Sequence, residues 1–570
     1  ENIVVVTLGN GFYNQHQRNV EGNLAYGKPR LFYFARIWED GRRRDEPGRQ
    51  DNWYCHAGPA ESNNIYFGER FDARLDMDWH AAKPAVVWEP AVTASDIDTV
   101  FRPQLCPPDR VQYTIYPRFL GMAGDRYVYD CGENIAGLAY FRCHAAKGET
   151  ITVRYAEELY PDGSLDFLSA GGAWQPQQDA YTGDGSPEQW YHPLYTWHGF
   201  RYLDFDAPVD EVRVLVINAD LRQWGDFRCS DGKLNAIVAA YRRSQLGNLH
   251  GGVPSDCPHR ERLGYTGDGQ LTLDTVMLFY DAAAFYEKWI RDIADGQCRV
   301  SGHIQHTAPF YGGGGGPGGW GCAMILAPYK LYEHTGDPSI LREYFDAMER
   351  WMQYLADHCE GRLVIREEEG GWCLGDWCFP DKEPPVPDIF VNSCYYANCA
   401  GLMSRIAAVL DLPERSAYYD ALAAEIRKEI ENRFYDPVAR QYAGAPQGAA
   451  FALFAGLRDR GAMENAVAHY EKTGCFDTGI LGTPLVLQML VETGREDILL
   501  SLLRTEKEPS FAYLFDGGCT TLRECWDGKE SHNHPMFGST VGVVFRQLSG
   551  ICPEEEAPGY RRMTIAPQFP

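Results

Sequence analysis

The chain has 570 residues, of which 45% are hydrophobic and 23% charged, a composition typical of a globular protein of roughly three to five domains. Its formal net charge of −26 argues against nucleic-acid and anionic-membrane partners, because both favour a basic patch. No run of about 18 apolar residues occurs, so we expect no membrane span.

Short runs of aromatic and β-branched residues, separated by Pro, Gly and Asp turn signals, fill the chain up to residue 226. Such runs are typical of β-strands, and Ile151, Val153 and Tyr155 are expected on one face of a strand. A Pro-rich stretch, Phe101–Arg110, divides this part of the chain. We therefore predict two β-sandwiches joined at that stretch.

The pattern changes near Cys229, where Ser230 is a candidate helix cap. Amphipathic helices are expected to alternate with Gly- and Pro-rich loops from there on, without a fixed repeat. The widest apolar stripe comprises Ile340, Leu341, Tyr344, Phe345, Met348, Trp351, Met352 and Leu355. A closed ring of paired helices, an (α/α)6 barrel, fits this length and pattern.

The predicted domains are thus β-sandwiches at 1–105 and 106–226, a catalytic (α/α)6 barrel at 227–552, and the start of a C-terminal β-domain or strand at 553–570. The first residues read as the middle of a strand and lack an initiator Met, so we expect the N-terminal domain to be incomplete. The final strand is expected either to pair with a sandwich or to begin a truncated C-terminal β-domain.

Cysteine and aromatic residues indicate a compartment and a ligand class. There are 17 cysteines without a CxxC pair, which favours mostly buried free thiols in a reducing, cytoplasmic environment. The 14 Trp, 34 Tyr and 27 Phe suit either sugar binding or simply a large core.

The stretch "GGVPSDCPHRERLGYTGDGQ" groups Asp256, Glu261 and Asp268 with two arginines, Arg260 and Arg262. This pattern fits either a charged surface loop or an active site with a general acid. A neighbouring arginine lowers a carboxyl pKa, so an acid at Glu261 needs burial or a second carboxylate close by. We expect both arginine side chains to point away from Glu261, and Asp256 or Asp268 to lie beside it.

A second polar segment, residues 516–540, places Glu524 two residues before Trp526 and follows them with His532 and His534. A carboxylate, an indole and imidazoles suit a sugar site. The two histidines could also suggest zinc, but no third ligand of a known zinc motif accompanies them, so we predict no metal.

Two further segments are weaker candidates. "YGGGGGPGGWG" lacks the GK[ST] of a phosphate loop, and either presents Trp320 or is a plain linker. "GGWCLGDWCFP" offers Trp372, Asp376 and Trp377 to a cleft or to the core. No nucleophile elbow or dinucleotide fingerprint occurs, which leaves two-carboxylate chemistry, of which glycoside hydrolysis is a common form.

These residues carry a resemblance to the α-L-rhamnosidases of glycoside hydrolase family 78. "DCPHRERLGYTGD" resembles that family's signature DCPQR-(D)-ERLGWTGD, and "RECWD" resembles its WERWD. The segments "VYDCGENIAG", "YAEELYPDGSL", "YHPLYTWHGFRYLDF", "TGILGTPLVLQML" and "SHNHPMFGS" extend the likeness over most of the chain.

The resemblance implies β-sandwiches followed by an (α/α)6 barrel, and roles for individual residues. Glu261 matches the general acid and Glu524 the general base of an inverting, exo-acting enzyme that removes terminal α-L-rhamnose from plant glycosides or polysaccharides. Asp256 and Asp268 match aspartates that hold rhamnose hydroxyls, with Arg260 beside them. Positions near the sugar are matched by Tyr265, Trp320, Asp376, Trp377, Trp526 and His534.

The chain departs from the family pattern at His259, Tyr265, Cys322 and Arg523, which puts the identity of the sugar in doubt. Two alternatives therefore stay open: a carbohydrate-binding protein on a degenerate catalytic scaffold, and a same-fold glycosidase for another deoxy- or uronic sugar. We expect a carbohydrate substrate, no cofactor, no nucleic-acid or membrane partner, and a homodimer as a candidate assembly.

Overall fold

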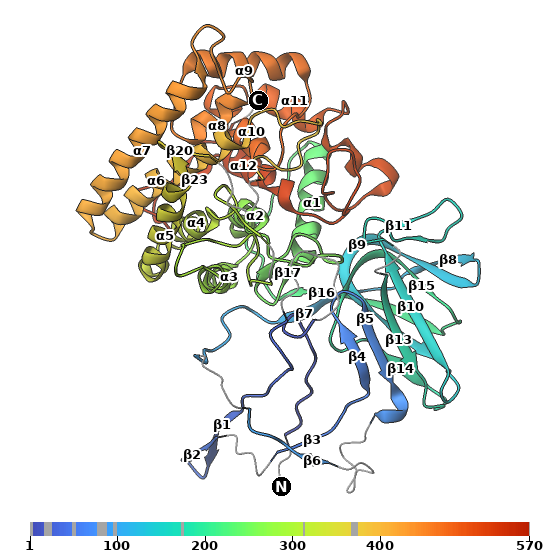
Figure 1. Cartoon of the computed structure of the whole chain (residues 1–570). Helices are drawn as coiled ribbons and strands as arrows, with labels where there is room; N and C mark the ends of the chain where they lie inside the picture. The colour runs from blue at the N-terminus through green and yellow to red at the C-terminus, as the bar shows by residue number, and fades with distance from the viewer. Residues whose placement is uncertain are drawn as a thin grey trace.

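The computed structural model describes residues 4–15, 25–47, 53–76, 88–94, 100–172, 176–311, 314–365 and 374–568. Figure 1 shows a β-rich part built from the first part of the chain and a helical part built from the remainder. The multidomain β-plus-helical organisation expected from the sequence is confirmed.

A ten-stranded sheet dominates the β-rich part. Its strands are antiparallel except for the pair β5 and β13, which run parallel. In spatial order the main path is β4 (Ala60–Asn64), β5 (Gly68–Asp72), β13 (Gln177–Thr182), β10 (Thr150–Ala156), β15 (His198–Phe205), β9 (Arg126–Cys143), β16 (Glu211–Ala219) and β7 (Asp109–Ile115), while β8 (Arg118–Ala123) and β14 (Gln189–Tyr191) also pair with β9.

Alternation along the strands explains which face of this sheet is buried. Ile151, Val153 and Tyr155 are at most 3% exposed, while Thr152 and Arg154 between them are partly exposed, as expected from the sequence. Phe141, Phe200 and other apolar residues of neighbouring strands join them in one cluster. Burial of this single apolar face holds the strands in register.

Strands from both sides of the predicted border at residue 105 share the large sheet, because β4 pairs with β5, and β5 pairs with β13. The other strands described before the border form two small two-stranded sheets, seen at the bottom of Figure 1: β1 (Phe34–Glu39) with β2 (Arg42–Pro47), and β3 (Tyr54–Cys55) with β6 (Glu89–Pro90). The division into two separate sandwiches stays a prediction.

The helical part contains twelve α-helices within the described ranges. They are α1 (Gly232–Gly247), α2 (Thr266–Phe279), α3 (Ala283–Asp295), α4 (Ala323–Thr335), α5 (Ser339–Asp357), α6 (Asp388–Val409), α7 (Pro413–Phe434), α8 (Gly448–Phe454), α9 (Arg460–Thr473), α10 (Gly482–Glu492), α11 (Glu496–Arg504) and α12 (Ser539–Ser549).

Every second helix belongs to a ring. Helix α2 contacts α4, α4 contacts α6, α6 contacts α8, α8 contacts α10, α10 contacts α12, and α12 returns to α2. The other helices pack against members of this ring, as α5 does against α4 and α6. We call α2, α4, α6, α8, α10 and α12 the inner helices.

The predicted amphipathic stripe of α5 is buried along its whole length, and Leu341, Met348, Trp351 and Leu355 have no exposed surface. At the start of α1 the predicted cap is wrong by one residue. Asp231, not Ser230, is the N-cap, because its carboxylate accepts hydrogen bonds from the backbone N–H groups of Lys233 and Leu234.

Short hairpins lie outside the large sheet, the first within the β-rich part and the others between helices. They are β11 (Glu158–Leu159) with β12 (Leu165–Asp166), β17 (Leu249–His250) with β18 (Val253–Pro254), β19 (Cys359–Glu360) with β20 (Leu363–Val364), and β21 (Tyr435–Asp436) with β22 (Gln441–Tyr442). The expected C-terminal strand, β24 (Met563–Ile565), pairs with β23 (Ile551–Pro553) just after α12. Its expected pairing with a sandwich is therefore wrong, because a nearer partner is available.

Two sequence-wide expectations concern membranes and thiols. Among the helices that the structure describes, none is both long enough and apolar enough to cross a membrane. The sixteen cysteines in the same part of the chain are all free, and most are buried or partly buried.

Candidate active site

The candidate site residues lie in or just before inner helices. Asp256 and Glu261 precede α2, Trp320 precedes α4, and Glu524 precedes α12. Because α2 contacts both α4 and α12, these N-terminal segments are neighbours. Asp268 lies in the first turn of α2, where the partial positive charge of the helix N-terminus favours a carboxylate.

Arg260 joins the two proposed catalytic carboxylates. Its Nη2 lies 2.6 Å from Glu524 Oε2, its Nε lies 3.3 Å from Glu261 Oε1, and its Nη1 lies 2.7 Å from Glu530 Oε2. Burial alone would lower the pKa of Arg260, but the surrounding negative charges, Glu524 first among them, together raise that pKa above its usual range. The expectation that this arginine points away from Glu261 is wrong, because three carboxylates surround its guanidinium.

Arg262 points away as expected. Its φ of 54° turns it into the interface with the large sheet, where its side chain is 1% exposed and donates to the His259 carbonyl and to Gln177 Oε1. Its guanidinium lies 5.1 Å from the centre of the Trp197 ring. Burial lowers the pKa of Arg262 to about 10.

Asp256 lies beside Glu261, which confirms the expectation that either Asp256 or Asp268 does so. Asp256 is 1% exposed, and its Oδ1 accepts from the Leu263 N–H at 3.0 Å. Burial and the Glu261 carboxyl raise the pKa of Asp256 well above its usual range. The raised pKa favours a proton on the Asp256 carboxyl.

His534 lies between two carboxylates. Its Nε2 is 3.0 Å from Asp268 Oδ1, and its Nδ1 is 3.5 Å from Glu524 Oε2. Burial would lower its pKa, but Glu524 and Asp268 raise the pKa of His534 to about 10. The imidazole is therefore a fixed cation at neutral pH.

All contacts of the Glu524 carboxyl converge on one oxygen. Arg260, His534 and the Ser531 N–H approach Oε2, the last at 3.3 Å. Within the described residues Oε1 has no hydrogen-bond partner, and the side chain is 12% exposed. One oxygen is thus held by the protein while the other is available to a substrate or a water molecule.

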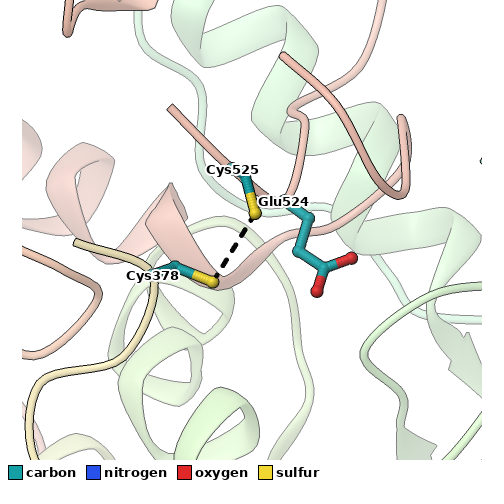
Figure 2. A group of neighbouring side chains, drawn as sticks. All are labelled: Cys378, Glu524 and Cys525. Carbon is teal, nitrogen blue, oxygen red and sulfur yellow. Dashed lines mark hydrogen bonds between the residues drawn. The ribbon is translucent and has the colours of Figure 1, made fainter. Parts of the chain in front are cut away.

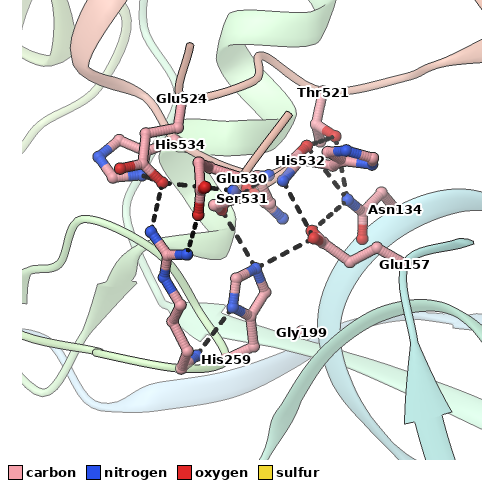
Figure 3. A network of polar contacts seen from close by, with 12 residues as sticks. Asn134, Glu157, Gly199, His259, Thr521, Glu524, Glu530, Ser531, His532 and His534 are labelled. Atoms are coloured by element: carbon pink, nitrogen blue, oxygen red, sulfur yellow. Dashed lines mark hydrogen bonds and ion pairs between the residues drawn. The ribbon is translucent and has the colours of Figure 1, made fainter. Parts of the chain in front are cut away.

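Glu157, from the end of β10, fastens the sheet to both catalytic segments (Figure 3). Its Oε2 lies 3.2 Å from His259 Nε2 and accepts from the His532 N–H at 3.0 Å, while Oε1 accepts from Asn134 Nδ2 at 2.8 Å. Burial alone would raise its pKa, but the His259 imidazole holds the pKa of Glu157 well below its usual range. His259 also hydrogen-bonds to Ser531 Oγ at 3.1 Å.

The aromatic candidates differ in how deeply they are buried and in what they contact. Trp320 is 4% exposed and packs on Gly267 of α2, and Tyr265 is half-buried at the N-cap of the same helix. Trp377 is 40% exposed. Trp526 is buried, stacks on Phe476 and donates its indole N–H to the Thr478 carbonyl, so it supports the site from behind.

Asp376 is a buried cap of an inner helix. Its carboxylate accepts from the backbone N–H groups of Gly479, Leu481 and Gly482 at 2.7, 2.9 and 3.1 Å, around the start of α10. Burial raises the pKa of Asp376 to about 6. Trp372, its neighbour in the predicted cleft segment, lies outside the described residues.

The histidines that raised the question of zinc do not converge. His532 Nδ1 contacts Glu158 at 2.8 Å, whereas His534 contacts Asp268 and Glu524. Donor atoms suited to a metal instead gather at Cys378, Cys525 and Glu524. Sequence reasoning missed this group, and it missed Glu157 although "YAEELYPDG" carries that residue.

Comparisons with known proteins show which family the chain is similar to. Family models match at residues 222–548 (bacterial alpha-L-rhamnosidase 6 hairpin glycosidase domain), 121–220 (bacterial alpha-L-rhamnosidase concanavalin-like domain) and 1–113 (alpha-L-rhamnosidase N-terminal domain). The chain is 27% identical to an alpha-L-rhamnosidase of Formosa agariphila, with 100% of this chain and 64% of that protein covered. It is 29% identical to one of Streptomyces avermitilis, with 91% and 51% covered.

Solved structures give the same result. The crystal structure of Streptomyces avermitilis alpha-L-rhamnosidase complexed with L-rhamnose superposes with a TM-score of 0.86 at 28% identity, covering 98% of this chain and 56% of that one. That of Aspergillus terreus alpha-L-rhamnosidase gives 0.83 at 26%, covering 93% and 64%. The chain spans between about half and two thirds of the length of these relatives. Because one of these family models matches more than half of the chain's residues, the chain belongs to the bacterial α-L-rhamnosidase family.

Proposed function

We propose that the chain acts as an inverting, exo-acting α-L-rhamnosidase. The observation that carries the proposal is the shared contact of Glu261 and Glu524 with Arg260, which assembles two carboxyl groups from distant segments in one site. Family membership gives the reaction class, since the relatives are alpha-L-rhamnosidases. The neutral sugar expected as substrate also suits a chain with a net charge of −26.

Glu261 is the proposed general acid. It is the more exposed member of the pair with Asp256, with 26% of its side chain accessible, so it can reach a glycosidic oxygen. Asp256 beside it holds a proton in a buried position, so the pair enters the reaction with a proton to give. Glu261 would receive this proton from Asp256 and transfer it to the leaving glycosidic oxygen.

Glu524 is the proposed general base. Arg260 and His534 fix its Oε2, and Oε1 would accept a proton from a water molecule that attacks the anomeric carbon. The positive charge of Arg260 lies nearer to Glu524, at 2.6 Å, than to Glu261, at 3.3 Å. This asymmetry supports opposite roles for the two carboxyl groups.

The remaining expectations are part of the same proposal. The ring of inner helices with its packed outer partners supports an (α/α)6 barrel as the catalytic domain. Asp268, held by His534 next to the catalytic pair, is proposed to bind sugar hydroxyls, and Tyr265, Trp320 and Trp377 are proposed to contact the sugar. A cytoplasmic location and a homodimer stay predictions.

A panel of p-nitrophenyl glycosides tests the proposal. The protein should release nitrophenol from the α-L-rhamnoside and not from matched fucosides, mannosides or glucuronides. Glu261→Gln should bind an unactivated alkyl rhamnoside and turn it over far more slowly. Rhamnose binding without hydrolysis by the wild-type protein would instead indicate a binding protein, and hydrolysis of another glycoside alone would indicate a different sugar.

A further inference from the structure

Two thiols lie next to the proposed catalytic base (Figure 2). The Sγ atoms of Cys378 and Cys525 are 3.8 Å apart. Both lie within 4.8 Å of a carboxylate oxygen of Glu524. The three groups come from two distant loops, one before α6 and one before α12.

The separation of the sulfur atoms suits a shared metal ion. Two thiolates bound to one tetrahedral zinc at about 2.3 Å are separated by about 3.8 Å. A disulfide would need its sulfur atoms at about 2.05 Å. The donor set of two sulfurs and one carboxylate oxygen leaves a fourth tetrahedral position for water.

Neighbouring contacts fix both thiols in place. Cys378 follows Asp376, which is held by three N–H groups around the start of α10, and the Trp377 carbonyl accepts from the Ile480 N–H at 2.8 Å. Cys525 stands between Glu524, which is held by Arg260, and Trp526, which is held in an aromatic cluster. A metal ion would therefore find its ligands close to the bound geometry.

The surroundings favour a soft cation. Among the ion pairs of the described residues, Arg260 contacts Glu261, Glu524 and Glu530, and His534 contacts Asp268 and Glu524, so carboxyl groups outnumber cations in this cluster. The hydrogen bond with Cys525, then burial, raise the pKa of Cys378, so a metal must displace its proton into solvent. Ions that bind thiolate strongly, such as Zn²⁺ and Cd²⁺, can do so, whereas Mg²⁺ and Ca²⁺ prefer oxygen alone.

We propose that Cys378, Cys525 and Glu524 form a binding site for a soft divalent cation, which blocks hydrolysis by occupying the base. On binding, both thiols lose their protons to solvent and two metal–sulfur bonds and one metal–oxygen bond form. The inhibitory part rests on the proposed role of Glu524, whereas the binding part does not.

Cadmium titration tests the binding part. The reduced, metal-free chain is titrated with Cd²⁺ while the ultraviolet thiolate-to-cadmium charge-transfer band is followed. The wild-type protein and the control Cys475→Ser, which removes another partly buried thiol, should bind one Cd²⁺ at least tenfold more tightly than Cys378→Ser or Cys525→Ser. Equal affinity and band intensity in all four proteins would overturn the site.

Two further arms separate this inference from the proposed function. Glu524→Gln should keep the thiolate-to-cadmium charge-transfer band, and its affinity for Cd²⁺ should fall at least tenfold. Unchanged affinity would overturn the three-ligand site. Wild-type hydrolysis should fall on addition of Cd²⁺ and return with EDTA, and Cys525→Ser should need at least tenfold more Cd²⁺ for the same fractional loss. Activity that persists with Cd²⁺ bound overturns the inhibitory part, whereas a wild-type protein inactive without metal contradicts the proposed function alone.

Discussion

Replacement of Glu157 by glutamine tests whether the large sheet positions the catalytic segments. Glu157 accepts from Asn134 through one oxygen and contacts His259 and the His532 N–H through the other. The glutamine amide has one acceptor oxygen, so its NH₂ group must face a donor. The loss of a hydrogen bond to a charged acceptor costs about 1.5–3 kcal/mol, and a buried donor left unpaired adds to it. We expect the free energy of unfolding to fall by about 2–4 kcal/mol.

Urea denaturation at pH 7 measures this change, and Glu158→Gln is the matched control. The Glu158 side chain is 44% exposed and its main contact is His532 Nδ1, so its loss should cost about 1 kcal/mol or less. The pKa of Glu157 is lowered by folding, so its stabilisation is present above its unfolded pKa of about 4.3 and is lost as pH falls towards the folded value. The effect of Glu157→Gln should therefore shrink in acid. Equal stability of both variants and wild type at pH 7 would refute the reasoning.

Three other substitutions have defined outcomes. Glu261→Gln should lower kcat on an alkyl rhamnoside by about 10²–10⁴ and less on a nitrophenyl rhamnoside, whose leaving group needs no proton; equal losses in steady-state assays would speak against general-acid catalysis. Gly267→Ala would place its Cβ 2.3 Å from Trp320, so the indole must move. We expect a shift in tryptophan fluorescence and a fall of about 1–3 kcal/mol in the free energy of unfolding. The absence of both changes would contradict the packing. Folding raises the pKa of Asp376 to about 6, so the associated stability is present below its unfolded pKa of about 3.9 and is lost as pH rises through 6. Asp376→Asn should flatten the pH dependence of unfolding between about pH 4 and 6, and an unchanged profile would exclude this assignment.

Local patterns predicted the element types well. The alternation of Ile151, Val153 and Tyr155 and the apolar stripe of α5 follow from burial of one face, which a sequence shows directly. The pairing of β5 with β13 could not be predicted in this way, because it joins residues about a hundred positions apart through backbone hydrogen bonds. Ser230 and Asp231 are both good caps, so sequence alone could not choose between them.

Most charged residues of the candidate site could be named from the sequence, but the contacts among them could not. Burial of Asp256 beside Glu261 follows the expectation that the acid needs a second carboxyl group. The path of the Arg260 side chain depends on Glu524 and Glu530, which the fold brings from far along the chain. Glu157 was missed for the same reason, since its partners lie on three different segments.

The central claim is that Glu524 activates water for an inverting hydrolysis. The most direct measurement follows the first-formed rhamnose by ¹H NMR as p-nitrophenyl α-L-rhamnopyranoside is hydrolysed by the wild-type protein and by Glu524→Gln. An inverting mechanism predicts that β-L-rhamnose appears first with the wild-type protein and that the variant releases almost none. Initial formation of α-L-rhamnose, or wild-type turnover by Glu524→Gln, would contradict it.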